Sequence, residues 1–187
     1  TGALAARVLD DRLTGWKAMV FCLAAAGLPD VDSLIGFGQE DYLIHHRAFT
    51  HSIVGLVVLA AVLSGFFKIL WQDVAFKRLF FIALGIMSLQ VYLDLATTFG
   101  TQILWPFSRH RFAFPGMFII DPFFTLGLLG IFFLTLVLKG KGKSLGRFGL
   151  AVAVIYPLIN LGIGAVLENR LAKTLPAAGG DFHGIHG

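Results

Sequence analysis

Long apolar runs separated by short polar stretches make up most of this chain. The five runs are Lys17 to Leu28, which is short, Ser52 to Leu70, Leu79 to Phe99, Ile119 to Leu138 and Phe148 to Leu167. A helix needs about 20 mostly apolar residues to cross the hydrocarbon of a bilayer. The runs lack the two-residue alternation of a barrel strand. We therefore expect an all-α polytopic membrane bundle of about five helices.

The composition agrees with a membrane protein. Of the 187 residues, 57% are hydrophobic and 14% are charged, whereas about a quarter of a soluble domain is charged. The net charge of +4 does not indicate nucleic acid, because basic residues in membrane proteins mainly anchor loops and set orientation. The single cysteine, Cys22, lies in an apolar run, and we expect it to pack as a small side chain.

Basic residues are divided unevenly between the two ends of the expected bundle. If the runs cross in turn, ten of the 15 lysines and arginines fall at one end and five at the other. Cytoplasmic loops are enriched in these residues. The second end also holds most acidic residues and the long loops, which are more often functional than connective. We expect a polar site there, on the extracytoplasmic face of the cell inner membrane.

No internal repeat or domain-sized change in composition is visible. We expect one transmembrane helical domain over residues 1–168 and a polar tail or linker over 169–187. The chain shows no cleavable signal peptide and opens at Thr1 without a methionine, so we expect the native start to be missing from this sequence.

The first candidate ligands are Asp30 and Asp32 in "LPDVD". Pro29 should end the short helix and favour an extended path, in which residues two apart point to the same side. Two such carboxylates repel each other unless a cation binds them. The alternative is a solvated turn at a helix end, although acidic groups beside hydrocarbon are costly without a role.

The stretch "HHRAFTHS" supplies candidate nitrogen ligands directly before an apolar run. His46 and His51 flank the expected helix start, where Thr50 or Ser52 can serve as N-cap. Zinc takes histidine nitrogen and carboxylate oxygen. A lone histidine would be an interfacial anchor, but two histidines near an Asp pair favour a metal site. We expect His45 to lie beside the site or to be exposed.

Asp94 lies well inside an expected transmembrane helix, where a carboxylate is a functional candidate by default. Gln90 is four residues earlier, on the same helical face. A hydrogen bond between helices is the alternative role for this pair. Asp121 opens the fourth run, where capping the helix is a sufficient role.

Basic and hydroxyl side chains at the same end are candidates to bind an anionic substrate. An arginine fork pairs with phosphate in a bidentate manner, although the same side chains would also meet anionic lipid head groups. The expected substrate contacts are Arg47, Thr98, Thr101 and Arg109.

"LPDVD", "HRAFTHS" and "LDLATTFGTQILWPFS", in this order and spacing, resemble the YdjM/YbcI-like family of membrane-bound metal-dependent hydrolases. The resemblance extends from the first residues to about Asp121. That family is in turn similar to zinc-dependent phospholipases C and single-strand nucleases, which are helical and hold a zinc cluster. The metal ligands that the resemblance implies are Asp30, Asp32, His46, His51 and Asp94.

The sequence departs from the family pattern at Gln90. The family has an H-x-x-x-D element there, and its usual histidine falls on this glutamine. A neutral amide oxygen is a poor zinc ligand, so Gln90 would make the site bind fewer metals, bind them more weakly, or be inactive. The family also tends to place a histidine directly before the pair that is here Thr1 and Gly2.

These observations predict a membrane hydrolase that uses one or more zinc ions, or another divalent metal, to activate water. We expect a phosphoester substrate, such as a membrane lipid head group, with Asp30 or Asp32 as general base. The alternative is a non-catalytic metal-binding membrane protein or an ion conduit. A conduit needs polar residues through the whole membrane, and the second and fourth apolar runs contain almost none.

Overall fold

The computed structural model describes residues 1–9, 15–34, 49–114, 116–118, 121–138 and 140–174, without the side chains at 32–34, 172 and 174. Every regular element in this part of the chain is a helix. They are α1 (Gly2–Val8), α2 (Gly15–Gly27), the 3-10 helix η1 (Leu28–Leu34), α4 (Ile53–Leu70), α5 (Phe76–Leu95), α6 (Pro122–Val137) and α7 (Gly142–Thr174).

The expected all-α membrane bundle is confirmed. Helices α4, α5 and α7 are long and apolar enough to cross a membrane. The fourth expected span is shorter than predicted, because α6 has 16 residues and begins at Pro122. Its N-cap is Asp121, whose Oδ1 accepts a hydrogen bond from the Phe124 amide at 3.0 Å, so the expected capping role is also confirmed.

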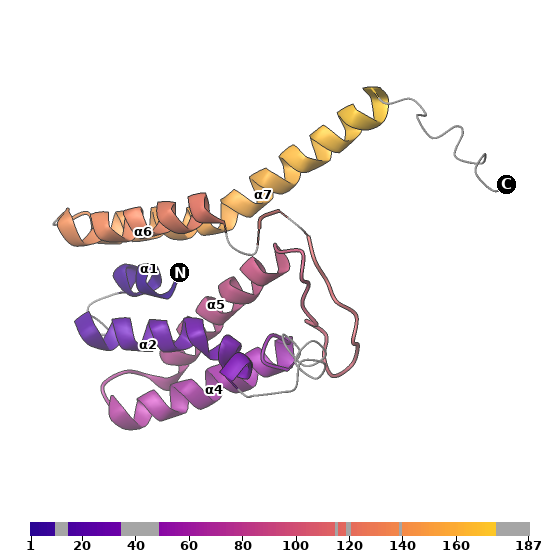
Figure 1. Ribbon diagram of the computed structural model, residues 1–187. Helices are drawn as coiled ribbons and strands as arrows, with labels where there is room; N and C mark the ends of the chain where they lie inside the picture. Colours follow the sequence, from indigo (N-terminus) through magenta and orange to yellow (C-terminus); the bar gives the residue numbers. More distant parts are fainter. Residues whose placement is uncertain (10–14, 35–48, 115, 119–120, 139, 175–187) are drawn as a thin grey trace.

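The helices form two layers (Figure 1). Helices α2, α4 and α5 pack on one another, while α6 packs along α7 and the short α1 lies between the layers. Phe21, Cys22, Leu79 and Met87 are fully buried in the α2–α4–α5 core. Because successive long helices run in alternating directions, the ends of α2 and α5 and the starts of α4 and α6 meet at one end of the bundle.

Helix α5 ends one turn before the predicted boundary at Phe99. The backbone amide of Thr97 and its Oγ1 both donate to the carbonyl oxygen of Asp94, at 3.1 and 2.7 Å. These bonds compete with the helical pattern and close the last turn at Leu95. Asp94 therefore lies in the final turn of α5 rather than well inside the helix.

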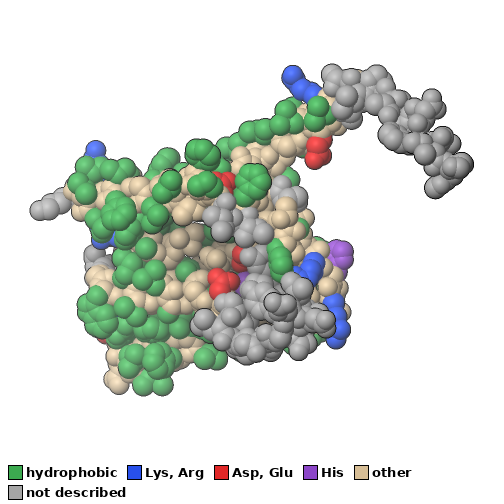
Figure 2. Space-filling view, in the orientation of Figure 1, with side chains coloured by type: hydrophobic (Ala, Val, Ile, Leu, Met, Phe, Trp, Pro, Cys, Tyr) green, Lys and Arg blue, Asp and Glu red, His purple; other side chains and the backbone are tan. Residues whose placement is uncertain are grey.

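Helix α7 extends beyond the predicted run at both ends. It has 33 residues and contains Pro157, and its second half leaves the rest of the bundle (Figure 1). In Figure 2, hydrophobic side chains cover most of the helical surface, while the few acidic side chains in view lie mainly near the middle of this face. Such an apolar outer surface suits a bilayer.

The first turn of α4 predicts a sharp difference between two glycines of that helix. A Cβ at Gly55 would lie 1.8 Å from the carbonyl oxygen of Phe49, which also accepts from the amide and hydroxyl of Ser52. Gly55→Ala should therefore destabilise the protein by roughly 2 kcal/mol, measured as a lower apparent melting temperature in detergent. Gly65→Ala is the control, because nothing lies within 4 Å of that Cβ. Equal melting of the two variants would contradict the described turn.

Candidate metal site

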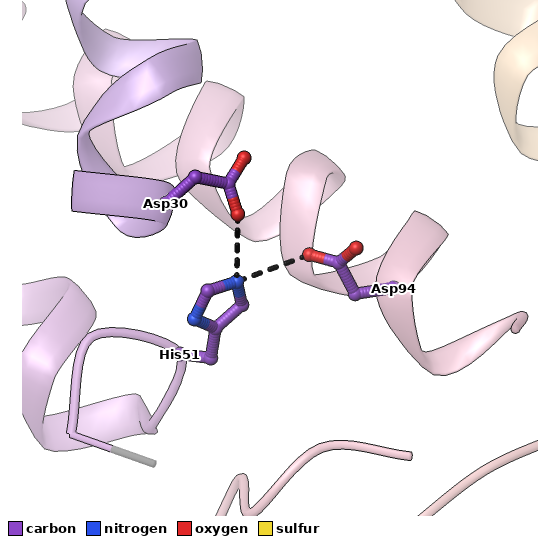
Figure 3. A group of neighbouring side chains, drawn as sticks. All are labelled: Asp30, His51 and Asp94. Carbon is purple, nitrogen blue, oxygen red and sulfur yellow. Dashed lines mark ion pairs between the residues drawn. The ribbon is translucent and has the colours of Figure 1, made fainter. Parts of the chain in front are cut away.

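Three potential metal ligands converge where α2, α4 and α5 meet. Nε2 of His51 lies 3.3 Å from Oδ1 of Asp30 and 3.1 Å from Oδ2 of Asp94. Figure 3 shows the three side chains pointing toward one another from η1, from the turn before α4 and from α5. Their ligand atoms all lie within 4.8 Å of one another. The cluster brings together three segments, of which those carrying Asp30 and Asp94 are 64 residues apart in sequence.

The turn before α4 fixes the position of His51. Ser52 is the N-cap of α4, and its Oγ accepts from the Gly55 amide at 3.0 Å and donates to the Phe49 carbonyl at 2.8 Å. Thr50 Oγ1 lies 3.0 Å from Nδ1 of His51. When Nδ1 carries the proton and donates to Thr50, Nε2 presents its lone pair to the carboxylates, which is the form that binds a metal.

Burial and neighbouring charges have opposite effects on the pKa of His51, which lies before the start of α4. Its side chain is fully buried, and desolvation lowers the pKa of the imidazole. Hydrogen bonds and charge from Asp94 and Asp30 outweigh desolvation, so the pKa of His51 is raised above its ordinary value of 6.5. The two carboxylates therefore favour a positive charge at His51, the position where a cation would also be favoured.

The two carboxylates differ in exposure. The Asp94 side chain is 10% exposed and the Asp30 side chain 44%. Asp94 is held in the closed last turn of α5, because its carbonyl oxygen accepts from Thr97. Asp30 therefore forms the open side of the cluster, and Asp94 and His51 form its buried side.

The path expected after Pro29 is wrong. Instead of an extended segment, Leu28–Leu34 form a 3-10 helix, in which positions three apart, not two apart, share a face. A proline near the start of a helix costs no hydrogen bond, which explains why Pro29 permits this turn. The extended path from which a shared direction of Asp30 and Asp32 was expected is therefore absent at Leu28–Leu34. The side chain of Asp32 is outside the described part of the structure.

The donor set suits a divalent cation. Ligand atoms about 2 Å from a tetrahedral ion lie roughly 3.3 Å from one another. The two separations between His51 and the aspartates match this spacing, and all three ligand atoms lie within 4.8 Å of one another. One imidazole nitrogen and two carboxylate oxygens are ligands of zinc and other first-row metals.

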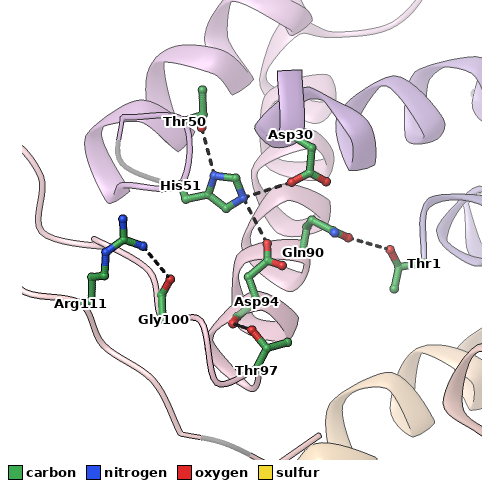
Figure 4. A network of polar contacts seen from close by, with 9 residues as sticks. All are labelled: Thr1, Asp30, Thr50, His51, Gln90, Asp94, Thr97, Gly100 and Arg111. Carbon is green, nitrogen blue, oxygen red and sulfur yellow. Dashed lines mark hydrogen bonds and ion pairs between the residues drawn. The ribbon is translucent and has the colours of Figure 1, made fainter. Parts of the chain in front are cut away.

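Gln90 lies one turn before Asp94 but contacts a different partner. Thr1 Oγ1 donates to Gln90 Oε1 at 3.5 Å, as the polar network in Figure 4 shows. Among the described residues, the group that could hold a metal ion consists of Asp30, His51 and Asp94 and does not include Gln90.

The other predicted site residues fall in different places. His46 and Arg47, like His45, lie outside the described residues. Thr101 is fully buried, and its backbone pairs with Phe112 through two hydrogen bonds of 2.9 and 3.0 Å. Thr98 and Arg109 are exposed, Thr98 in the turn after α5 and Arg109 in the loop that follows. The expected substrate contacts of these residues stay predictions.

Two features were missed by sequence reasoning. The first is the contact of Thr50 with His51. The position of a hydroxyl residue directly beside a candidate ligand in the sequence could have indicated this contact. The second is Tyr156, whose hydroxyl donates to Oδ2 of Asp121 at 2.9 Å across the α6–α7 layer. Tyr156 and Asn160 are one helical turn apart in an otherwise apolar run, and this spacing was the available signal.

Comparison with known proteins places the chain in a family. The family described as the YdjM inner membrane protein matches residues 1–170. The chain belongs to the YdjM family. It is also similar to the uncharacterized protein YfhP of Bacillus subtilis (strain 168), with 27% identity over 170 residues. That match covers 89% of the chain and 50% of YfhP. The chain thus spans about half the length of this relative. No solved structure matches. The described residues also contain three helices long and apolar enough to cross a membrane, so this YdjM family member is a membrane protein.

The raised pKa of His51 predicts an unusual pH dependence for the metal-free YdjM family member. The proton shared with Asp30 and Asp94 stabilises the fold fully below the ordinary pKa of 6.5, and this contribution is lost as pH rises through the raised folded-state pKa. In detergent with a chelator, the apparent melting temperature should therefore be higher at about pH 6 than at about pH 8.5. Zinc should restore stability at the higher pH, because it takes the place of the proton.

His51→Gln should remove most of this difference between the two pH values. The matched control is His110→Gln, since His110 is exposed in the loop after α5 and should leave the difference unchanged. The same pH dependence in wild type and His51→Gln would contradict the assignment.

Proposed function

We propose that this protein is a membrane-embedded, metal-dependent hydrolase that cleaves a phosphoester. The observation that carries the proposal is the convergence of His51, Asp30 and Asp94 at one end of an apolar bundle. Ionisable groups at the edge of hydrocarbon are costly unless they pair or bind an ion. Three side chains from separate segments facing one point support a function beyond helix packing.

Zinc is the metal that we favour, and another divalent cation would suit the same ligands. Three protein ligands leave a coordination position open, as in catalytic zinc sites. When bound there, the ion would lower the pKa of a water molecule and polarise a phosphoryl oxygen. His46 and Asp32 are proposed as further ligands, and His46 and the Asp32 side chain lie outside the described residues.

The protein side chains divide the remaining tasks. His51 and Asp94 are buried and would hold the ion in place, with Thr50 fixing the imidazole and Thr97 fixing the turn that carries Asp94. Asp30 is the more exposed carboxylate and is the candidate to accept a proton from the attacking water. Asp32 is the second candidate for this role.

A lipid head group is the phosphoester that the position favours. The cluster lies at the ends of spanning helices, which is the depth of head groups in a bilayer. Arg47, Arg109, Thr98 and Thr101 are proposed to bind the anionic part of the substrate. The excess of lysine and arginine at the opposite end supports an extracytoplasmic site.

Metal analysis together with hydrolysis assays tests the proposal. Purified protein should bind zinc and hydrolyse a phosphodiester or a phospholipid, whereas His51→Ala and Asp94→Asn should each lower activity by roughly 100-fold or more and weaken zinc binding. Asp73→Asn is the control, because Asp73 is an exposed carboxylate in the turn between α4 and α5. Bound zinc without turnover of any ester would favour a metal-binding protein or conduit. Absence of bound metal would rule out both.

Thr50→Val gives a finer test of how His51 is oriented. The substitution keeps the shape of Thr50 but removes its contact with Nδ1 of His51. Loss of such a supporting contact should weaken zinc binding by about tenfold or more, measured by competition with a zinc chelator. Thr50→Ser keeps the hydroxyl and should restore binding. Equal zinc affinity of Thr50→Val and wild type would contradict the orienting role.

A further inference from the structure

A cavity separate from the ligand cluster lies between the start of α6, the middle of α7 and the segment after α5. Its volume is ≈ 730 Å³, a size that suits a small molecule or a lipid head group. Thr98 contributes to its lining and follows Asp94 by four residues, so the cavity begins at the end of the bundle that carries the cluster. Its lining does not include Asp30, His51 or Asp94.

Asp121, which lines this cavity, forms no ion pair with a lysine or arginine of the described residues. The residue is buried, and its two carboxylate oxygens accept from the Phe124 amide at 3.0 Å and from the Tyr156 hydroxyl at 2.9 Å. Capping α6 does not require the charge, because a neutral asparagine caps a helix equally well. A buried carboxylate at the edge of hydrocarbon is costly without a positive partner, so the charge indicates a cationic ligand.

Three residues that line the cavity offer hydrogen-bond acceptors. The carboxylate of Asp121 has lone pairs beyond the two that it uses, and the Tyr156 oxygen keeps its own lone pairs after donating to Asp121. Asn160, one turn after Tyr156 on α7, adds an amide oxygen. A negatively charged set of acceptors disfavours phosphate and favours a cation with several N–H donors. A primary ammonium group has three such donors.

The residues around the cavity are held in place by packing within the protein. The ring of Tyr156 packs on Phe124 with 5.3 Å between centroids. A Cβ at Gly116 would lie 2.3 Å from the carbonyl oxygen of Pro157, and the Gly116 amide donates to the Ala96 carbonyl at 2.9 Å. The segment after α5 is thereby fixed against the middle of α7 (Figure 1). Such preorganisation reduces the entropy lost when a ligand binds.

The position of the cavity favours a lipid head group as the source of the ammonium. The start of α6 and the end of α5 lie at one end of the bundle, at the depth where head groups border the hydrocarbon. In an ethanolamine phospholipid, two carbon atoms join a primary ammonium to the phosphate. A head group bound here leaves its acyl chains in the bilayer, so the cavity need not admit them.

We propose that this cavity binds the primary ammonium group of an ethanolamine phospholipid. The ammonium donates to Asp121, Tyr156 and Asn160 and neutralises the buried carboxylate. The phosphate of the same head group lies on the side of Thr98, toward the metal ligands. The assignment of the amine to a lipid substrate rests on the proposed function, whereas binding of the ammonium requires neither metal nor turnover.

Two pairs of variants separate the cavity from the rest of the protein. Asp121→Asn removes the charge but keeps a residue that caps α6, and Glu168→Gln is its control, because Glu168 is an exposed carboxylate of α7 outside the cavity lining. Tyr156→Phe removes the hydroxyl that contacts Asp121. Its control is Tyr92→Phe, which also loses one hydrogen bond, to the Val154 carbonyl, away from the cavity.

Native mass spectrometry of the delipidated protein, in detergent with a chelator, measures the binding. The probes are the dioleoyl forms of phosphatidylethanolamine, phosphatidylcholine and phosphatidylglycerol, which share their chains. Wild type should bind phosphatidylethanolamine at least about tenfold more tightly than the other two, since choline has no N–H donor and glycerol has no charge. Asp121→Asn should bind all three within about twofold of one another, whereas Glu168→Gln and Tyr92→Phe should keep the preference. Tyr156→Phe should reduce the preference by about threefold or more.

Equal binding of the three phospholipids by wild type would overturn the proposal, and so would an unchanged preference in Asp121→Asn and Tyr156→Phe. Circular dichroism and gel filtration check the fold, and Tyr156→Phe alone decides if Asp121→Asn fails to fold. Free ethanolamine is added as a competitor at the concentration of the lipid. Displacement of the lipid under this condition would assign the cavity to a soluble amine and would contradict the lipid assignment.

The hydrolysis assay with zinc separates this proposal from the proposed function. Preferred binding of phosphatidylethanolamine without cleavage of any ester would contradict the hydrolase and leave the ammonium site intact. Cleavage of all three phospholipids at equal rates, together with equal binding, would contradict the ammonium site alone.

Discussion

The imidazole of His51 is fully buried, and its Nε2 lies between the carboxylates of Asp30 and Asp94. Two negative charges at the edge of hydrocarbon repel each other, and a cation or a proton between them lowers the free energy of placing them there. Each carboxylate belongs to a different segment, so this one interaction ties η1 and α5 to the start of α4. The surrounding hydrogen bonds of Thr50 and Ser52 hold the turn before α4, and that of Thr97 holds the end of α5.

The fold could be predicted well where apolar runs have clear ends. Helix α4 begins within one residue of the predicted start, because Ser52 caps it and the run before Trp71 is continuous. The end of α5 was missed, since hydrogen bonds from Thr97 to the Asp94 carbonyl close the helix early. A hydropathy pattern cannot predict such local hydrogen bonds, because they change the backbone path without changing the apolar character of the segment.

The candidate site could be predicted in part. His51 and Asp94 were selected because polar groups in apolar surroundings are costly, and that reasoning needs no coordinates. The relation of Asp30 to Asp32 depends on the backbone after Pro29, for which both extended and 3-10 conformations satisfy the fixed φ of proline. The cavity beside Tyr156 arises from the packing of α7 against α6 and the segment near Gly116. Contacts between segments so far apart leave no local pattern in the sequence.

The unequal lengths of α6 and α7 have a consequence for the bilayer around the protein. Helix α6 has 16 residues, or roughly 24 Å at 1.5 Å per residue, whereas the hydrocarbon is about 30 Å thick. Helix α7, with 33 residues, is longer than this thickness. Such hydrophobic mismatch is relieved by local thinning of the bilayer beside the short helix and by tilting of the long one. Thinning beside α6 would bring the water boundary closer to Asp121, the residue that caps the start of this short helix.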